Sequence, residues 1–272
     1  MPGEAAASCS GLVKIYWTAT GEVHALKGVD AVFPVAAVSA VVGPSGSGKS
    51  SLLRILAGLD RPTAGQVQIG GVRLSGLSVT RLRRVRRRLL GYVFQRPADN
   101  LIPYLTVAEH LRLAARLRGG RAAGTDDGAE LLELLGLADR RQHRPRELSG
   151  GEQQRLAFAG AVVGDPPLVV ADEPTAELDR AAGAALLAAV RALAARGTAL
   201  VLATHDPAVV ALAERTLYLR HGAMEAEATR QEALSVIDEA GRVQLPPEAL
   251  GLFPDRRARI GVEQGRVWIG PP

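Results

Sequence analysis

The chain has 272 residues, of which 47% are hydrophobic and 22% charged, with a formal net charge of +5. This length exceeds the common size of one domain, and the composition is that of a globular protein, which excludes a disordered chain. The longest uncharged Ala-rich run, residues 181–190, is far shorter than the roughly 20 residues of a membrane-spanning helix. No secretion signal is recognisable at the N-terminus, so a cytoplasmic location is expected.

The numbers and positions of cysteine and arginine residues further limit the kinds of site and partner that this protein can have. A lone cysteine, Cys9, excludes an internal disulfide framework and the usual cysteine-based metal sites. Arginines are concentrated in residues 81–90, RLRRVRRRLL, and such a run could bind nucleic acid or anionic lipid. Leu82, Val85 and Leu89 nevertheless form one apolar stripe at helical spacing, which favours a solvated amphipathic helix. Nucleic acid is therefore not expected as a partner.

Strand-like and helical patterns alternate along most of the chain, which predicts a largely parallel sheet with helices on both faces. Leu and Ala at helical periods over residues 100–160 predict an α-helical insertion, interrupted by a loop at 119–128. The predicted strands cover residues 11–17, 29–33, 36–42, 66–70, 91–95, 166–172 and 197–205. Helices are predicted over residues 50–58, 81–90 and 180–196.

The glycine-rich segment 43–51, GPSGSGKSS, has the G-x-x-x-x-G-K-[ST] spacing of a phosphate-binding P-loop and lies between a predicted strand and helix. Its glycines let successive backbone N–H groups point at phosphate oxygens, beside the positive end of the helix. Lys49 is expected to reach the β- and γ-phosphates, and Ser50 to bind Mg²⁺. The predicted phosphate-binding residues are Gly43, Pro44, Ser45, Gly46, Ser47, Gly48, Lys49, Ser50 and Ser51.

An apolar strand ending in two acids, LVVADE at 168–173, predicts the second half of this site. Ligands bind at the carboxyl ends of strands in open α/β sheets, which is where Asp172 emerges. We expect Asp172 to hold Mg²⁺ and Glu173 to act as the general base that takes a proton from the attacking water.

Residues 148–155, LSGGEQQR, resemble the signature motif of the ABC ATPases, and the chain resembles that family from about residue 10 to residue 229. The Ser149 hydroxyl and the N–H groups of Gly150 and Gly151 form an anion-binding surface at a helix start, with Glu152 beside them. An ordinary N-cap for a helix over 152–163 is the alternative interpretation. The resemblance implies that this surface closes over ATP held by a second subunit, in a head-to-tail homodimer or pair of ABC ATPases.

The same resemblance assigns four positions one at a time. Gln95 matches a glutamine near Mg²⁺ and the attacking water, whose loop contacts the membrane-spanning partner, and His205 matches a histidine at the γ-phosphate. Asp179 matches a loop that communicates between the two sites. Tyr16, with Trp17 as a possible substitute, matches the aromatic residue that stacks on adenine. Without the other motifs in this order, a histidine after a strand would usually have a structural role, and an aromatic residue on an N-terminal strand would usually belong to the core.

Three segments resemble one branch of the family: GEVHALKGV at 21–29, RILAGLDRPTAGQV at 54–67 and NLIPYLTVAEH at 100–110. This branch contains lipoprotein-releasing, macrolide-exporting and antimicrobial-peptide-resistance ATPases. The resemblance implies a cytoplasmic subunit held at the inner face of the membrane by a membrane-spanning partner, in export or envelope-related work. Ala176 and Glu177 depart from the family's usual small and amide residues but remove no catalytic group.

The motifs together predict an α/β fold: a P-loop NTPase core with a largely parallel sheet, an N-terminal antiparallel β subdomain, an α-helical insertion and a small β-rich C-terminal appendage. The predicted core covers residues 1–95 and 160–229, and the helical, signature-bearing subdomain covers 96–159. Residues 230–272 form the predicted appendage.

The appendage resembles the AbrB-like swapped-hairpin domain, through VIDEAGRVQLPPEAL at 236–250 and a hairpin at 258–269. Some relatives of that fold bind DNA, but Arg256, Arg257 and Arg259 are too few to indicate it, so dimerisation or regulation is preferred. The leading functional prediction is an ATP-hydrolysing subunit of an ABC transporter. Alternatives are a non-transport ABC ATPase acting as a mechanical or signalling relay, and a regulator that uses the appendage.

Overall fold

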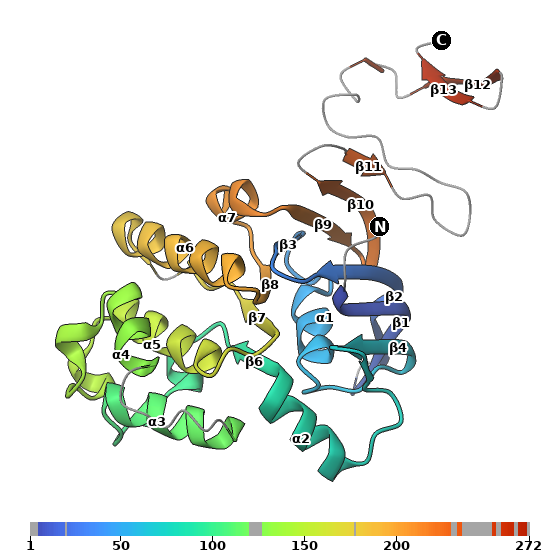
Figure 1. Ribbon diagram of the computed structural model, residues 1–272. Helices are drawn as coiled ribbons and strands as arrows, with labels where there is room; N and C mark the ends of the chain where they lie inside the picture. Colours follow the sequence, from blue (N-terminus) through green and yellow to red (C-terminus); the bar gives the residue numbers. More distant parts are fainter. Residues whose placement is uncertain are drawn as a thin grey trace.

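A computed structural model describes residues 5–19, 21–119, 127–176, 178–229, 233–235, 252–253, 257–263 and 266–270. Within these ranges the chain forms a four-stranded sheet, a seven-stranded sheet and a separate two-stranded pair, with helices around the larger sheet (Figure 1). The predicted α/β class, with an antiparallel N-terminal sheet and a mostly parallel core sheet, is confirmed.

The seven-stranded sheet carries the predicted motifs at one edge. Its order is β11-β10-β9-β3-β8-β7-β6, and the neighbours from β9 to β6 run parallel. Because parallel strands share the edge at which their carboxyl ends lie, the segments after β3, β6, β7 and β8 meet there. The strands are β3 (Val38–Val42), β6 (Leu90–Val93), β7 (Leu168–Asp172), β8 (Ala199–Ala203), β9 (Arg215–Arg220), β10 (Ala223–Thr229) and β11 (Ala233–Ser235).

The antiparallel sheet has the order β2-β1-β4-β5 and packs against the core sheet through α1. Four apolar residues of α1 are buried because the helix contacts both sheets. The first two strands are longer than predicted, since small residues such as Ala6 and Ala7 are buried without giving a strong strand pattern. The elements are β1 (Ala5–Thr18), β2 (Gly21–Pro34), α1 (Lys49–Leu56), β4 (Ala64–Ile69) and β5 (Val72–Arg73).

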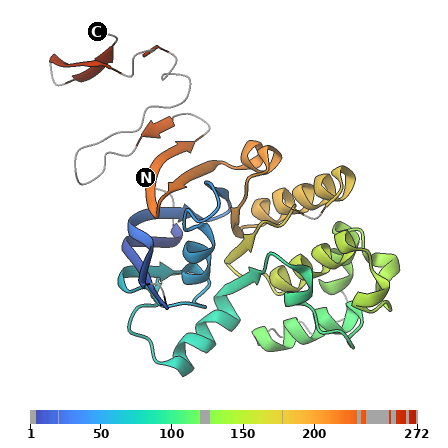
Figure 2. The ribbon, with the colours of Figure 1, turned by 180° about the vertical axis from the view of Figure 1, so that it is seen from behind.

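Side chains along the core strands point alternately to the two faces of the sheet, and they divide the hydrophobic interior into two clusters. On β7, Val169 and Ala171 pack in the cluster that contains α5 (Gly150–Val162) and α6 (Arg180–Ala195). Leu168 and Val170 pack in the cluster that contains α1. Side chains alternate between the two faces of a strand, so this sheet is covered on both sides, as predicted (Figure 2).

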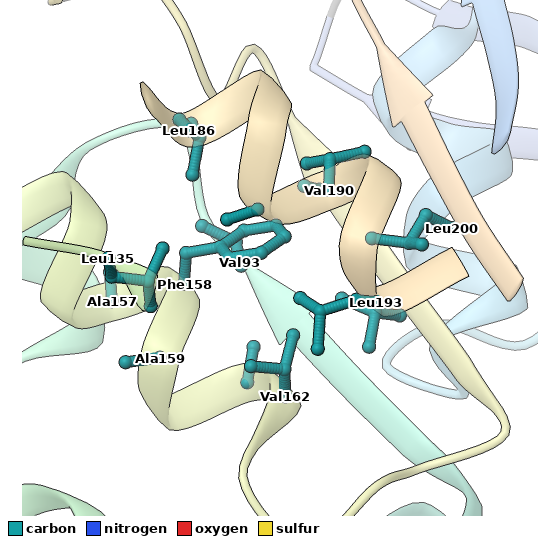
Figure 3. Packing of buried hydrophobic residues seen from close by; sticks show 14 of the residues in the cluster. Val93, Leu135, Ala157, Phe158, Ala159, Val162, Leu186, Val190, Leu193 and Leu200 are labelled. Atoms are coloured by element: carbon teal, nitrogen blue, oxygen red, sulfur yellow. The ribbon is translucent and has the colours of Figure 1, made fainter. Parts of the chain in front are cut away.

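The cluster beneath α5 and α6 fixes the helix that contains most of the signature motif. Figure 3 shows the ring of Phe158 from α5 in a group with Val93 of β6 and Leu186 and Val190 of α6. All four side chains are fully buried. Close packing of this kind holds α5 in a defined position relative to the sheet.

The helical insertion is also observed. Residues 120–126 of the predicted loop lie outside the described residues. On the arginine-rich helix α2, Leu82, Val85 and Leu89 are half-buried, as their stripe predicts. The helices are α2 (Val79–Leu89), η1 (Pro97–Asn100), α3 (Val107–Arg118), α4 (Asp127–Leu134), η2 (Ala138–Arg140), η3 (Pro145–Glu147) and α7 (Pro207–Leu212). Of the helices described, none combines the length and apolarity needed to cross a membrane.

Near the C-terminus, β12 (Arg259–Glu263) pairs antiparallel with β13 (Arg266–Gly270), as the hairpin prediction requires. Residues 236–250, which carry the first part of the AbrB-like resemblance, lie outside the described residues. The structure therefore establishes a small β pair in this region.

Candidate functional site

The P-loop includes two glycines, Gly43 and Gly48, that cannot be replaced without collision. Gly48 is the N-cap of α1 with φ of 104°, and a Cβ there would lie 2.4 Å from the carbonyl oxygen of Ala25. A Cβ at Gly43 would lie 2.1 Å from the carbonyl oxygen of Leu219. Lys49 Nζ donates to the carbonyl oxygens of Gly43, at 2.7 Å, and Pro44, at 3.1 Å. The ammonium group thus lies across the mouth of the loop.

A cavity of 640 Å³ brings most of the predicted site together. It lies where the carboxyl ends of the parallel strands meet the P-loop. The predicted residues that line it are Tyr16, Gly43, Pro44, Ser45, Gly46, Ser47, Gly48, Lys49, Ser50, Ser51, Gln95, Asp172, Glu173 and His205. Val23, His24 and Ala25 of β2 complete the lining, and the sequence patterns did not indicate them.

Asp172 ends β7 inside this cavity, in contact with the P-loop helix. Burial raises the pKa of the Asp172 carboxyl, and a hydrogen bond from Ser50 opposes that shift. A carboxylate and a hydroxyl are oxygen ligands of the kind Mg²⁺ prefers, and Mg²⁺ commonly takes its remaining ligands from water and phosphate. Among the described residues there is no cluster of three or more metal-ligating acids, histidines or cysteines.

Glu173 is held in an uncommon conformation beside Asp172. Its φ is 47°, a left-handed value that strains a residue with a side chain, and its N–H donates to Ala203 O at 2.9 Å. Its Oε1 lies 3.0 Å from Nδ1 of His205, and this carboxylate raises the pKa of the exposed histidine. The other oxygen, Oε2, is buried and meets no hydrogen-bond partner in the described structure. One oxygen of the predicted base is therefore left unpaired by the described part of the protein.

The sequence analysis predicts that Gln95 and His205 are the last residues of their strands, and this prediction is wrong. β6 ends at Val93 and β8 at Ala203, two residues earlier in each case. After β8, the side chain of Thr204 accepts the N–H of Asp206 at 2.9 Å, which turns the chain out of the sheet. Side-chain hydrogen bonds of this local kind compete with strand pairing, and they set these ends.

Thr175 and Asp206 are supporting residues that the sequence analysis missed. Thr175 Oγ1 donates to Asp206 Oδ2 at 2.8 Å, and Asp206 Oδ1 accepts the N–H of Ala208 as the N-cap of α7. This bond joins the segment after β7 to the segment after β8, and so links the surroundings of Glu173 and His205. An aspartate before Pro207 was a visible N-cap signal.

Tyr16, rather than Trp17, lies at the nucleotide cavity. The Tyr16 hydroxyl donates to Asp60 Oδ2 at 3.0 Å, and Lys14 Nζ lies 4.7 Å from the centre of its ring. Trp17 is 79% exposed and is absent from the cavity lining. The geometry therefore favours Tyr16 between the two aromatic residues left open by the sequence.

The signature turn lies outside this cavity. Ser149 is the N-cap of α5: its Oγ accepts the N–H of Glu152 at 3.2 Å, and Glu152 Oε2 accepts the N–H of Ser149 at 2.8 Å. The N-cap interpretation is thus correct for the local structure, although α5 starts at Gly150 and not at residue 152. Accepting this bond leaves the hydroxyl hydrogen of Ser149 available for donation. Ser149 and Gly150 are exposed, and a Cβ at Gly150 would meet nothing within 4 Å.

Asp179 belongs with the signature turn and not with the P-loop cavity. Its Oδ1 accepts the N–H of Ala182 at 2.8 Å, so it is the N-cap of α6. A Cβ on Gly151 would lie 3.4 Å from Leu178 Cδ2, which places the neighbouring residue of Asp179 beside the signature turn. The predicted residues therefore form two separate groups in one chain.

Comparisons with known proteins agree with these motifs. Residues 26–176 match the family model described as ABC transporter. An ABC transporter ATP-binding protein of Thermotoga maritima is 44% identical over 213 residues, which cover 78% of this chain and 90% of that protein. The lipoprotein-releasing system ATP-binding protein LolD of Shewanella sp. (strain MR-4) is 43% identical over 70% of this chain and 82% of its own length.

Larger relatives and a solved structure extend the likeness. The macrolide export ATP-binding/permease protein MacB of Hyphomonas neptunium is 38% identical over 82% of this chain, which spans only 34% of MacB. A dimeric post-hydrolysis structure of the ATP-binding cassette MJ0796, bound to ADP and Pi, has a TM-score of 0.76 and 34% identity, covering 82% of this chain and 98% of the other. The chain therefore belongs to the ABC transporter family, as an ATP-hydrolysing subunit of an ATP-driven transporter.

Proposed function

We propose that the chain hydrolyses MgATP in a head-to-tail pair of cassettes, in which each P-loop cavity is closed by the other protomer's signature turn. The observation that carries this proposal is the separation of two anion-binding surfaces. One group of residues lines the cavity, whereas Ser149 and Gly150 stand exposed outside it. A helix start with exposed N–H groups attracts phosphate, so a second copy supplies the simplest way to use both surfaces on one nucleotide.

Within the cavity the proposed roles follow from the donor atoms. Lys49 and the P-loop amides hold the phosphates, and Asp172 with Ser50 holds Mg²⁺, near Gln95. Glu173 acts as general base, which agrees with the unpartnered Oε2, and His205 contacts the γ-phosphate. Ser47 Oγ, also buried without a partner among the described side chains, offers one more phosphate contact.

The groups outside the cavity act across the dimer in this proposal. Ser149, Gly150 and Gly151 contact the partner's nucleotide, and Glu152 holds the serine through the capping box. Asp179 communicates between the two sites because its segment lies beside the signature turn.

Tyr16→Ala is expected to weaken ATP binding by about 5- to 150-fold, because stacking of a base on an aromatic ring is worth roughly 1–3 kcal/mol. Trp17→Ala is the matched control, since Trp17 is 79% exposed outside the cavity and its loss should change affinity less than about twofold. Fluorescent-nucleotide titration measures both. The opposite ranking would assign the stacking role to Trp17.

We further propose a membrane-spanning partner, in export or envelope-related work, which would hold this chain at the inner face of the membrane. The related proteins named for lipoprotein release and macrolide export support this class of work. A groove of 380 Å³ near the start of the Gln95 loop supports a docking place. Leu90, Tyr92 and Phe94 line it together with Arg83 and Arg87 of α2. An acidic amphipathic segment of the partner would complement it.

Charge reversal tests this docking place. Arg83→Glu with Arg87→Glu is expected to abolish co-purification of the membrane partner from detergent-solubilised membranes, with basal ATP turnover kept. The control is Arg81→Glu with Arg84→Glu, an equal charge change on α2 outside the groove lining. Equal losses in both variants would overturn the docking place. Recovery of no membrane protein by the unaltered chain would favour the non-transport relay.

The appendage is proposed to support dimerisation or regulation, in the manner of an AbrB-like unit. In β12 and β13, Ile260, Val262 and Val267 are 70%, 71% and 66% exposed. A two-stranded hairpin is marginally stable alone, so this apolar face favours pairing with a second copy. The alternative, a DNA-binding regulator, predicts filter retention of duplex DNA that falls steeply with salt.

A further inference from the structure

The backbone around Gln95 is held by one side chain, that of Asn100, to which the sequence analysis gave no role. β6 is the edge strand of the core sheet, and its pairing with β7 ends at Val93. At Phe94 the chain leaves the sheet, and the side-chain amide of Asn100 takes the place of a neighbouring strand. Phe94 N–H donates to Asn100 Oδ1 at 2.9 Å, and Asn100 Nδ2 donates to Phe94 O at 3.2 Å.

Asn100 makes a third bond on the other side of Gln95. Its Nδ2 also donates to the carbonyl oxygen of Arg96 at 3.0 Å. The Asn100 side-chain oxygen thus accepts one backbone N–H, and its two amide hydrogens are donated to two backbone carbonyl groups. These partners fix the orientation of the amide. The two residues that flank Gln95 are both fastened to a single half-buried side chain.

The segment after Asn100 is itself bonded to the helical insertion, so the insertion also holds Asn100 in place. Ile102 N–H donates to Nε2 of His110 on α3 at 2.8 Å, and His110 Nδ1 lies 2.8 Å from the carbonyl oxygen of Thr106. An acceptor at Nε2 requires the neutral imidazole. Burial lowers the pKa of His110, which agrees with that form.

We propose that Asn100 is a positioning residue for ATP hydrolysis: by holding Phe94 and Arg96, it fixes where the Gln95 side chain enters the nucleotide cavity. Gln95 is exposed and lines that cavity, so its own side chain has few neighbours to orient it. The inference rests on the proposed role of Gln95 near the metal and the attacking water. Asn100 touches neither nucleotide nor metal in this scheme and acts only through Gln95.

A double-mutant cycle between Asn100 and Gln95 tests the proposal on the full-length chain. Asn100→Asp keeps the size and the acceptor for Phe94 N–H, but it replaces two donors with an oxygen that faces two carbonyl groups. We expect kcat to fall by about 10- to 100-fold, because misplacing a reacting group by about 1 Å can cost 10²-fold. ATP affinity, set by the P-loop, should stay within about twofold. In a Gln95→Ala background, Asn100→Asp should lower kcat by less than about twofold more.

Asp99→Asn is the matched control. Asp99 pairs with the guanidinium of Arg96, with Oδ2 3.1 Å from Nε, in the same turn but on the solvent side. Its loss removes a neighbouring interaction and leaves the backbone bonds of Asn100 intact, so kcat should match that of the unaltered chain. Thermal unfolding of each variant reports its folding, and Asn100→Ser replaces Asn100→Asp if that variant does not fold.

The outcomes separate the inference from the function on which it rests. An equal loss of kcat from the Asn100 substitution in both backgrounds shows a general structural effect and overturns the positioning role, as does unchanged kcat in Asn100→Asp. If Gln95→Ala alone leaves kcat unchanged, the proposed role of Gln95 is wrong, and the role of Asn100 falls with it. A loss confined to the background that retains Gln95 supports both.

Discussion

Glu173→Gln is expected to slow ATP hydrolysis by about 10²- to 10⁴-fold while ATP still binds, because a general base contributes a factor of that order. Glutamine has nearly the shape of glutamate but cannot take a proton from water. The strained backbone at Glu173, with φ of 47°, is kept, since the replacement asks for no new conformation. Dimers should therefore accumulate with ATP, because bound nucleotide is no longer consumed.

Gel filtration with ATP measures the dimer, and steady-state phosphate release measures turnover. Glu133→Gln, an exposed glutamate on α4, is the control and should behave as the unaltered chain. The pKa of His205 provides a second readout by NMR: the Glu173 carboxylate raises it, so it should fall toward the usual 6.5 in Glu173→Gln. A variant that stays monomeric with ATP bound would count against the paired arrangement.

Lys49→Ala is expected to weaken ATP binding strongly. Each charge-assisted hydrogen bond from the ammonium group to phosphate is worth roughly 1.5–3 kcal/mol, which corresponds to about a 10- to 150-fold loss in affinity. Lys49 lies across the P-loop mouth, with Nζ 2.7 Å from the carbonyl oxygen of Gly43, and so can exchange that carbonyl for phosphate.

Isothermal titration with ATP measures this loss. Lys27→Ala removes the same charge from an exposed position on β2 outside the cavity, and its affinity should be unchanged. Binding by Lys49→Ala that equals binding by the Lys27 control would remove Lys49 from its proposed role.

The parts of the site that are predictable from sequence are those built by neighbouring residues. The P-loop depends on glycines that lie close together in one short loop, and a Cβ at Gly43 or Gly48 would collide with backbone atoms. Asp172 ends an otherwise apolar strand and Glu173 follows it, so the two charges mark the strand's end. In both cases the same few residues set the backbone conformation and carry the chemistry. The order of the motifs along the chain was therefore enough to predict that these groups share one site.

Features fixed by distant side chains could not be predicted in this way. The end of β6 at Val93 depends on Asn100, and the link between the segments after β7 and β8 depends on Thr175 and Asp206. β1 extends back to Ala5 because its small residues are covered by the rest of the fold, which no local periodicity records. Each case requires knowledge of which side chain meets which backbone group in three dimensions.

The most direct test of the paired mechanism is the structure of the Glu173→Gln protein with bound MgATP. We predict that Ser149 Oγ of one protomer lies within hydrogen-bond distance, about 2.7–3.0 Å, of the γ-phosphate held by the partner's P-loop. The mechanism would be contradicted if the Ser149 turn were packed against its own protomer, away from every nucleotide.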